Sequence, residues 1–146
     1  MQLLVAGRLG CSRLDLYMQF DRPLDEDDLA PLREMLRKRG EGVPLQHLLC
    51  SVEFHRREFR CDARALVPRP ETEELAERLL AALPADFSGR LLDLGCGSGV
   101  LGLTAAAERP AATVVLADIS NDALNLAREN AAKLGIFDVG FIASDL

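Results

Sequence analysis

The sequence predicts an α/β fold in which helices pack against a parallel sheet. Strand-like and helix-like patterns alternate from residue 90 onward in the 146-residue chain, and three alternating glycines follow the first of these strands. Such alternation is typical of βαβ units with parallel strands. Three strands are predicted, about half of the number in a doubly wound sheet, so we expect the first half of such a sheet.

The first forty residues are predicted to be helical. A stripe of leucines at helical spacing lies between the acidic run 25–28 and the basic run 37–39, and Gly40 follows. Acids at the start of a helix and bases at its end stabilise the helix dipole, and glycine is a common stop. A shorter helix is expected over residues 3–9.

A small hairpin and a rigid connector are expected next. The apolar positions Val52, Phe54 and Phe59 predict two short strands joined by a charged turn. Segment 67–73 contains two prolines, which fix φ and bias the preceding residues away from helix. A helix with an apolar register that begins at Leu75 is predicted to follow.

Three parts are therefore expected in the chain. They are a partial helical domain over residues 1–42, a hairpin and connector over 43–72, and the first half of the sheet domain over 73–146. In the last part, Ser120 is the expected cap of a helix and Gly135 its stop. The predicted strands and helices, in chain order, are 90–94, 98–108, 113–117, 121–134 and 139–143.

The position of the first strand has a consequence for association. The run that forms it is apolar and is expected to be buried at the centre of a complete sheet. In a sheet of three strands it becomes an edge, with its apolar faces and backbone exposed. We therefore expect self-association through this edge or a loosely folded C-terminal half.

Composition narrows the classes of function. A net charge of −6 argues against a protein that binds nucleic acid through its whole surface. No apolar run approaches the roughly 18 residues of a membrane span, and the N-terminal sequence lacks the features of a secretory signal. We therefore expect a cytoplasmic protein without membrane association or direct nucleic-acid contact. The basic group His55, Arg56, Arg57 and Arg60 is interpreted as a solvated hairpin edge, with a docking patch as the alternative.

No metal site is predicted. The four cysteines and two histidines lack the spacing of zinc or redox motifs. Free cysteine is usually buried in folded proteins. Reduced and mostly buried thiols are therefore expected.

The glycine turn after the first strand is the main candidate for a ligand site. Asp93 stands near the end of the strand, and Gly95, Gly97 and Gly99 alternate after it. Glycine accepts a positive φ and allows a ligand to approach the backbone closely. Residues 97–102 also form a G-x-G-x-x-G, so an NAD-dependent Rossmann-like oxidoreductase is one alternative.

Charge favours S-adenosylmethionine over a dinucleotide at this turn. The carboxylate of Asp93 would repel a pyrophosphate but would attract the sulfonium and ammonium groups of S-adenosylmethionine. Asp118, at the end of the next strand, has paired oxygens that suit a ribose diol, and it is also a typical helix-capping residue. Asp145 follows the third strand, where it could accept the adenine amino group or serve as a turn residue.

Four segments of the chain match the order and approximate spacing of known family signatures. These segments are 39–47, 52–54, 66–73 and 93–99. By them the sequence resembles the release factor glutamine N5-methyltransferases, also called the HemK or PrmC family, along essentially its whole length. The Pro-Arg-Pro-Glu-Thr-Glu strap at 68–73 is the most specific segment, since related ribosomal-protein glutamine methyltransferases differ after the arginine.

The resemblance implies a donor and an acceptor. The donor is S-adenosyl-L-methionine, with residues 95–99 around its methionine part, Asp118 on its ribose and Leu146 beside its adenine. The acceptor is the glutamine in the Gly-Gly-Gln loop of class I peptide-chain release factors, with strap residues Arg69, Glu71 and Thr72 on the substrate side. The candidate cofactor-binding residues are Asp93, Gly95, Cys96, Gly97, Ser98, Gly99, Asp118, Asp145 and Leu146.

The sequence departs from the family in three respects. It begins inside what resembles the family's N-terminal helical domain, so we expect further helices upstream. Cys50 stands where the family usually has glycine, and the family's catalytic Asn-Pro-Pro-Tyr motif has no counterpart, because the chain contains no Asn-Pro pair. In the family this motif orients the substrate amide nitrogen toward the methyl group. We therefore predict no catalytic residue in the 146-residue chain and expect no methyl transfer by it alone. A non-catalytic release-factor-binding fragment is the second alternative.

Overall fold

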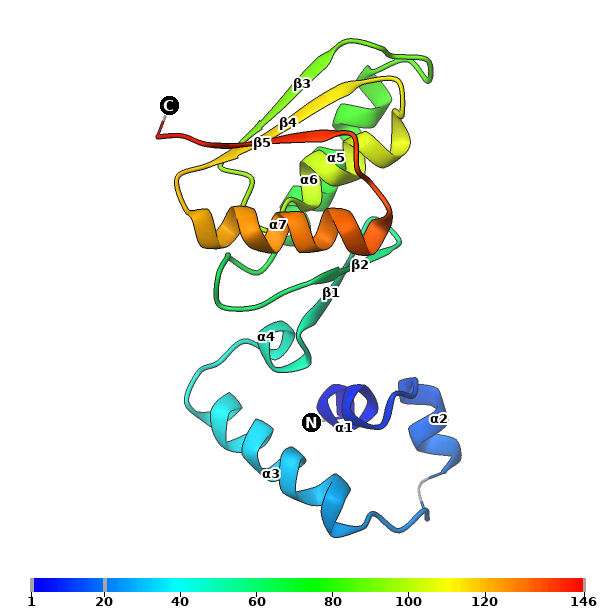
Figure 1. The fold of residues 1–146 in the computed structure, drawn as a ribbon. Coiled ribbons are helices and arrows are strands. Elements are labelled where there is room, and N and C mark those ends of the chain that lie inside the picture. The colour runs from blue at the N-terminus through cyan, green and yellow to red at the C-terminus, as the bar shows by residue number, and fades with distance from the viewer. Residues whose placement is uncertain (1, 20, 146) are drawn as a thin grey trace. The chain divides into compact units, whose positions relative to one another are not determined.

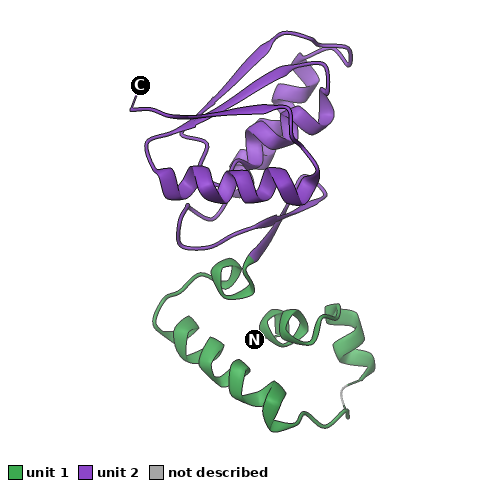
Figure 2. Ribbon diagram, viewed as in Figure 1, with its two compact units in different colours: residues 1–50 green, residues 51–146 purple. Residues whose placement is uncertain are grey.

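The computed structural model describes residues 2–19 and 21–145. Its contacts divide the chain into two compact units, residues 1–50 and 51–146 (Figure 2). The first unit is helical, and the second contains a two-stranded sheet and a three-stranded sheet with their helices. The division into three parts at residues 42 and 72 stays a prediction.

Within the described residues, all regular secondary structure of the first unit is helical. The expected helix after the acidic run is present, and the Asp25 side chain caps it by accepting a hydrogen bond from the Asp28 N–H at 3.1 Å. Gly40 lies inside this helix, and Glu41 is the C-cap, so the helix ends slightly later than predicted. The helices are α1 (Gln2–Leu9), α2 (Arg13–Met18), α3 (Glu26–Gly40) and α4 (Leu45–Leu49).

The short helices α2 and α4 were not predicted from periodicity. Helix α2 begins with a capping box, in which the Ser12 hydroxyl accepts from the Asp15 N–H and the Asp15 carboxylate accepts from the Ser12 N–H. A serine followed three residues later by an acid is a recognised start signal, so this helix was detectable. Helix α4 has no side-chain cap, and its five residues are too few to show a helical period.

The second unit opens with the predicted hairpin of β1 (Ser51–Phe54) and β2 (Arg57–Arg60). Phe54 and Phe59 are buried, and their rings meet edge to face with centroids 6.1 Å apart. Two of the hairpin's basic residues are held by helices of the same unit, because Arg57 pairs with Glu108 at 2.6 Å and Arg60 with Glu129 at 3.3 Å. The interpretation of this group as a solvated edge is therefore wrong for Arg57, whose side chain is largely covered, and holds for Arg60, which stays exposed beside its partner.

A parallel sheet with helices on one face follows, as the sequence predicts (Figure 1). The strand order is β3-β4-β5, so consecutive strands are neighbours. Inward-facing side chains of the sheet pack with α5, α6 and α7 in one hydrophobic core. The elements are α5 (Pro70–Ala82), β3 (Arg90–Leu94), α6 (Val100–Glu108), β4 (Thr113–Asp118), α7 (Asn121–Leu134) and β5 (Val139–Ala143).

The sequence predicts α7 more accurately than α5. Helix α7 has the predicted bounds, with the Ser120 side chain as cap and Gly135 in the left-handed conformation at its end. In α5 the buried residue is Ala76, whereas Leu75 is 52% exposed, so the predicted apolar register is wrong at its first position. Its later members Leu79, Leu80 and Leu83 are half-buried. A small alanine allows close packing in the core, and leucine spacing alone does not show this.

Strand β3 is an edge within the described residues and pairs only with β4. The expectation that this strand becomes an edge with apolar side chains exposed is confirmed for one face of the sheet. Leu92 is 63% exposed and Leu94 48%, and Ile142 on β5 is 51% exposed on the same face. Self-association through this edge stays a prediction.

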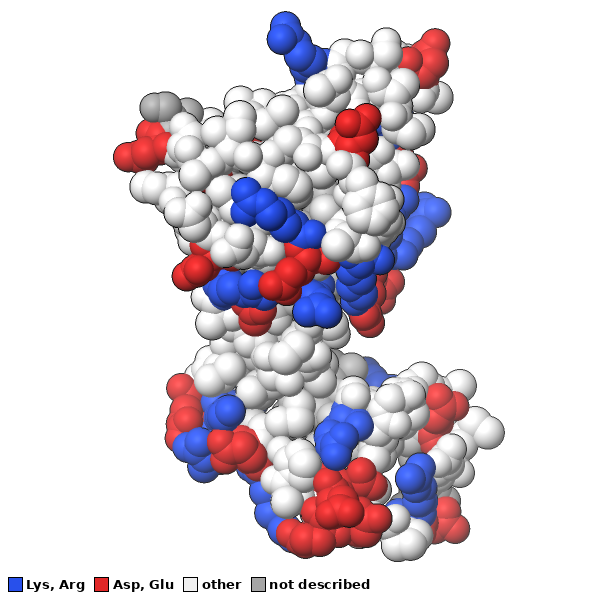
Figure 3. All heavy atoms as spheres, viewed as in Figure 1, with Lys and Arg blue, Asp and Glu red and all other residues white. Residues whose placement is uncertain are grey.

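The surface mixes charges of both signs. On the face drawn in Figure 3, Lys and Arg side chains lie among Asp and Glu without a continuous basic area. Among the described residues, no helix combines the length and the hydropathy of a membrane span. Within the residues that the structure describes, no group of three or more His, Cys, Asp or Glu side chains could hold a metal ion. Two of the four cysteines, Cys61 and Cys96, are buried, whereas Cys11 is half-buried and Cys50 is exposed.

Candidate functional site

The glycine turn between β3 and α6 has the conformation that the sequence predicts. Gly95, Gly97 and Gly99 have φ values of 71°, 54° and 80°. A Cβ at Gly99 would lie 3.0 Å from side-chain atoms of Ala127 and Leu116, so this glycine is needed for packing as well as for its φ. A Cβ at Gly95 would meet no atom within 4 Å, so its outer side is open to a ligand.

The last glycine of the G-x-G-x-x-G serves packing between α6 and β3. The Gly102 N–H donates to Asp93 Oδ2 at 2.8 Å, and a Cβ at Gly102 would lie 2.9 Å from the same oxygen. Asp93 therefore caps the first turn of α6 and places a carboxylate at the helix N-terminus. A pyrophosphate would need that position for itself, so the geometry disfavours a dinucleotide.

The same arrangement raises the pKa of Asp93. Burial raises the pKa of Asp93, the Gly102 hydrogen bond opposes the rise, and the negative charge of Asp118 adds to it. Ionisation of Asp93 thus costs more in the folded chain than in the unfolded chain. Its contribution to stability is complete below the ordinary aspartate pKa of about 3.9 and declines as pH rises through the higher folded value.

Asp93→Asn is expected to remove this pH dependence. An asparagine stays neutral and can still accept the Gly102 N–H, so the wild type should lose stability relative to the variant as pH rises from about 4 to 7. Urea unfolding across this range measures the difference, with the exposed Asp122→Asn as the control for a lost negative charge. A stability difference that does not change with pH would contradict the assignment.

Asp118 joins the glycine turn to the start of α7. Its Oδ2 accepts the Gly97 N–H at 2.8 Å, and its Oδ1 accepts the Ser120 N–H at 2.9 Å. Asp118 therefore fixes the glycine turn next to the start of α7. The helix cap itself is Ser120, whose hydroxyl accepts the Ala123 N–H, so the helix-capping interpretation of Asp118 is wrong. A carboxylate has about four acceptor positions, so each oxygen can accept one further hydrogen bond, for example from a ribose diol.

A cavity of about 420 Å³ opens between the strap and the glycine turn. Residues 64–69 and Thr72 form one side, and residues 95–98 with Asp118 lie across from them. The thiol of Cys96 also lines the cavity. Burial, together with the charges of Asp93 and Asp118, raises the pKa of Cys96 to about 12. Cys96 is therefore a neutral part of the wall and not a nucleophile at neutral pH.

The cavity brings together about half of the residues that the sequence proposed. Asp93 and Gly99 lie outside its lining and hold the turn in place, whereas Glu71 and Asp145 are exposed and do not line it. Leu146 lies outside the described residues. The proposed residues that line the cavity are Arg69, Thr72, Gly95, Cys96, Gly97, Ser98 and Asp118.

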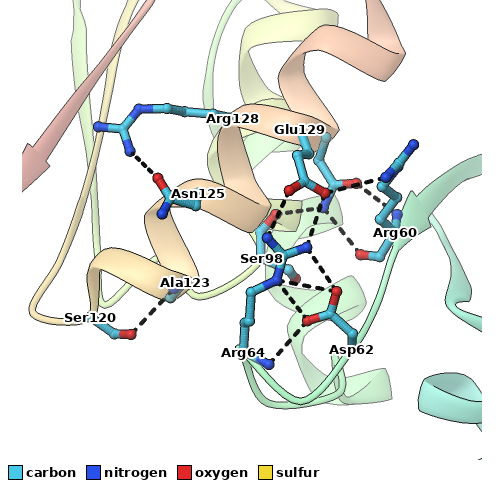
Figure 4. Close-up of polar contacts among 10 residues, drawn as sticks. Arg60, Asp62, Arg64, Ser98, Ser120, Ala123, Asn125, Arg128 and Glu129 are labelled. Atoms are coloured by element: carbon cyan, nitrogen blue, oxygen red, sulfur yellow. Dashed lines mark hydrogen bonds and ion pairs between the residues drawn. The ribbon is translucent and has the colours of Figure 1, made fainter.

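An ion-pair cluster that sequence reasoning missed fixes the segment 62–64, which precedes the strap (Figure 4). Arg64 donates from Nε and Nη2 to Asp62 at 2.8–3.2 Å. It also donates from Nη1 and Nη2 to Glu129 of α7 at 2.7 and 2.9 Å. These carboxylates raise the pKa of Arg64 above its already high value. The cavity wall at Arg64 is thus tied to α7.

Asn130, the next residue of α7, is fully buried at 0% exposure and was also missed. Its Oδ1 accepts the Arg60 N–H at 2.6 Å, and its Nδ2 donates to the carbonyls of Arg60 and Ser98 at 3.2 and 2.9 Å. One side chain therefore joins the end of the hairpin to the glycine turn. An asparagine on the buried stripe of α7, beside Leu126 and Ala127, was the signal that could have found it.

The fold and the glycine turn are those of the first half of a Rossmann-like α/β domain of the methyltransferase class, and family comparison agrees with this. Residues 71–146 match the methyltransferase small domain, and residues 1–49 match the PrmC N-terminal domain. The chain therefore belongs to the family of the methyltransferase small domain. The Trm5b structure from Pyrococcus abyssi supports the fold with a TM-score of 0.55, at 17% identity over 66% of this chain and 28% of that one.

Curated relatives extend the similarity along the chain. Release factor glutamine methyltransferases of Rhodopirellula baltica and Chlorobaculum tepidum are 37% and 38% identical to it over 99% of its length. They confirm the resemblance to that family, which rested on the segments 39–47, 52–54, 66–73 and 93–99. The chain covers 51% of each of these relatives, so it spans about half the length of the curated relatives it matches.

Proposed function

We propose that the chain binds S-adenosyl-L-methionine in the cavity beside the glycine turn. The observation that carries this proposal is the occupation of the α6 N-terminus by Asp93, while a second carboxylate, Asp118, lines the cavity. Two carboxylates suit a ligand that carries a sulfonium and an ammonium and no phosphate. They would repel the dianionic pyrophosphate of NAD.

Each part of the donor then has a partner in the second unit. Asp118 accepts the ribose hydroxyls, and the open backbone of residues 95–98 lies along the methionine part. Asp145 and Leu146, after β5, are the proposed neighbours of the adenine. Asp93 and Gly99 contribute to donor binding indirectly. Asp93 fixes the glycine turn through its hydrogen bond to Gly102, and Gly99 allows the turn to pack closely against the core.

We infer a release factor glutamine as the acceptor from the names of the relatives, and its finer description from the family resemblance. The proposed reaction is N5-methylation of the glutamine in the Gly-Gly-Gln loop of a class I release factor. The glutamine amide nitrogen attacks the methyl carbon, the carbon–sulfur bond breaks to give S-adenosylhomocysteine, and the nitrogen loses a proton. An amide nitrogen is a weak nucleophile, so positioning of the two reactants supplies much of the rate. The residues of this chain supply the donor side of that positioning.

Titration calorimetry with S-adenosylhomocysteine and with NAD tests the donor proposal. We expect one molecule of S-adenosylhomocysteine to bind per chain and NAD to give no binding heat. Tighter binding of NAD would favour the oxidoreductase alternative, and failure of both to bind would remove the donor site altogether.

The acceptor proposal needs a separate measurement. A fluorescently labelled class I release factor should bind the chain in an anisotropy titration, and S-adenosylhomocysteine should bind independently of it. Release factor binding without any S-adenosylhomocysteine binding would favour the non-catalytic binding fragment.

A further inference from the structure

Three charged residues line the described part of the cavity, and their surroundings differ. They are Arg64, Arg69 and Asp118. S-adenosylmethionine carries two cationic groups, the sulfonium and the ammonium, and one anionic group, its α-carboxylate. A residue that recognises this carboxylate must present a positive charge that is not already neutralised.

Arg64 does not meet that requirement. Each of its three guanidinium nitrogens donates to a carboxylate oxygen of Asp62 or Glu129 at 2.7–3.2 Å (Figure 4). Its positive charge therefore faces two negative charges within hydrogen-bonding distance. Arg64 ties the segment before the strap to α7 and leaves little net attraction for a ligand carboxylate.

Arg69 does meet it. No ion pair or side-chain hydrogen bond joins the Arg69 guanidinium to another residue that the structure describes. Its backbone is nevertheless fixed, because the prolines at 68 and 70 restrict φ on both sides and its carbonyl accepts the Thr72 N–H at 2.9 Å. Arg69 is thus an exposed, unpaired cation on a rigid segment of the cavity wall.

We propose that Arg69 binds the α-carboxylate of S-adenosylmethionine and selects donors that carry it. This assignment rests on the proposed function and moves Arg69 from the acceptor side, implied by the family resemblance, to the donor side. A guanidinium can bind a carboxylate through two parallel hydrogen bonds, which gives geometric selectivity as well as attraction. Asp118 then orients the ribose, and Arg69 holds the amino-acid end of the same molecule.

The test compares two ligands that differ only in the carboxylate, S-adenosylmethionine and decarboxylated S-adenosylmethionine. Calorimetry should show that the wild type prefers S-adenosylmethionine. Arg69→Ala should weaken binding of S-adenosylmethionine about tenfold, as expected for loss of a charged hydrogen-bonded contact, and change binding of the decarboxylated ligand by less than about twofold. Arg69→Lys should keep part of the preference.

The matched control is Arg78→Ala, which removes an exposed arginine of α5 that pairs with Glu74 away from the cavity lining. It should leave both affinities unchanged. Equal weakening of the two ligands by Arg69→Ala, or no weakening of either, would overturn the assignment while leaving the donor site intact. Absence of binding by the wild type to S-adenosylmethionine and to S-adenosylhomocysteine would overturn the proposed function and this assignment together.

Discussion

Asn130→Ala is expected to lower the free energy of unfolding of the second unit by about 3 kcal/mol. The substitution removes three hydrogen bonds and leaves the Arg60 N–H and two carbonyl oxygens without their partner. An unsatisfied buried polar group costs about 1–3 kcal/mol, and water that enters the new space offsets part of this cost. The loss should be large because Asn130 is completely buried.

Urea unfolding followed by circular dichroism measures this change, and Asn125→Ala on the same helix is the matched control. Asn125 is exposed and accepts one hydrogen bond from the neighbouring Arg128 at 3.1 Å (Figure 4), so its replacement should cost less than about 0.5 kcal/mol. Hydrogen exchange should also show faster opening at residues 95–99 in Asn130→Ala. Similar losses for the two variants would show that Asn130 does not join the hairpin to the turn.

The parts of the fold that could be predicted are those that local chemistry determines. Helix α7 has its predicted bounds because a serine cap and a left-handed glycine mark its two ends. The turn after β3 was predictable because glycine is the residue that commonly adopts a positive φ, as Gly95, Gly97 and Gly99 all do. Strands β3 and β5 also have their predicted bounds, since short apolar runs lie between turn signals.

The parts that could not be predicted depend on contacts between distant residues. Arg64 and Glu129 are 65 residues apart, and Arg60 and Asn130 are 70 apart, so no local pattern connects them. The role of Asp93 also depends on packing. The sequence places a carboxylate near the turn, but only the close approach of α6 at Gly102 directs it to the helix N-terminus.

Asp118→Ala is expected to weaken binding of S-adenosylhomocysteine about 100-fold. Hydrogen bonds to a charged group contribute about 1.5–3 kcal/mol each, and the ribose diol can donate two of them to this carboxylate. The variant also removes the acceptor of the Gly97 N–H, which fixes the glycine turn. The two causes predict different behaviour toward a ligand that lacks a ribose hydroxyl, so they can be separated.

The 2′-deoxy analogue of S-adenosylhomocysteine makes that separation. In the wild type it should bind more weakly than S-adenosylhomocysteine by about tenfold, whereas Asp118→Ala should bind both ligands with nearly equal affinity, because the partner of the missing hydroxyl is gone. The exposed Asp122→Ala on α7 should preserve the wild-type difference. If Asp118→Ala still discriminates between the ligands as the wild type does, Asp118 only holds the turn, and another group must bind the ribose.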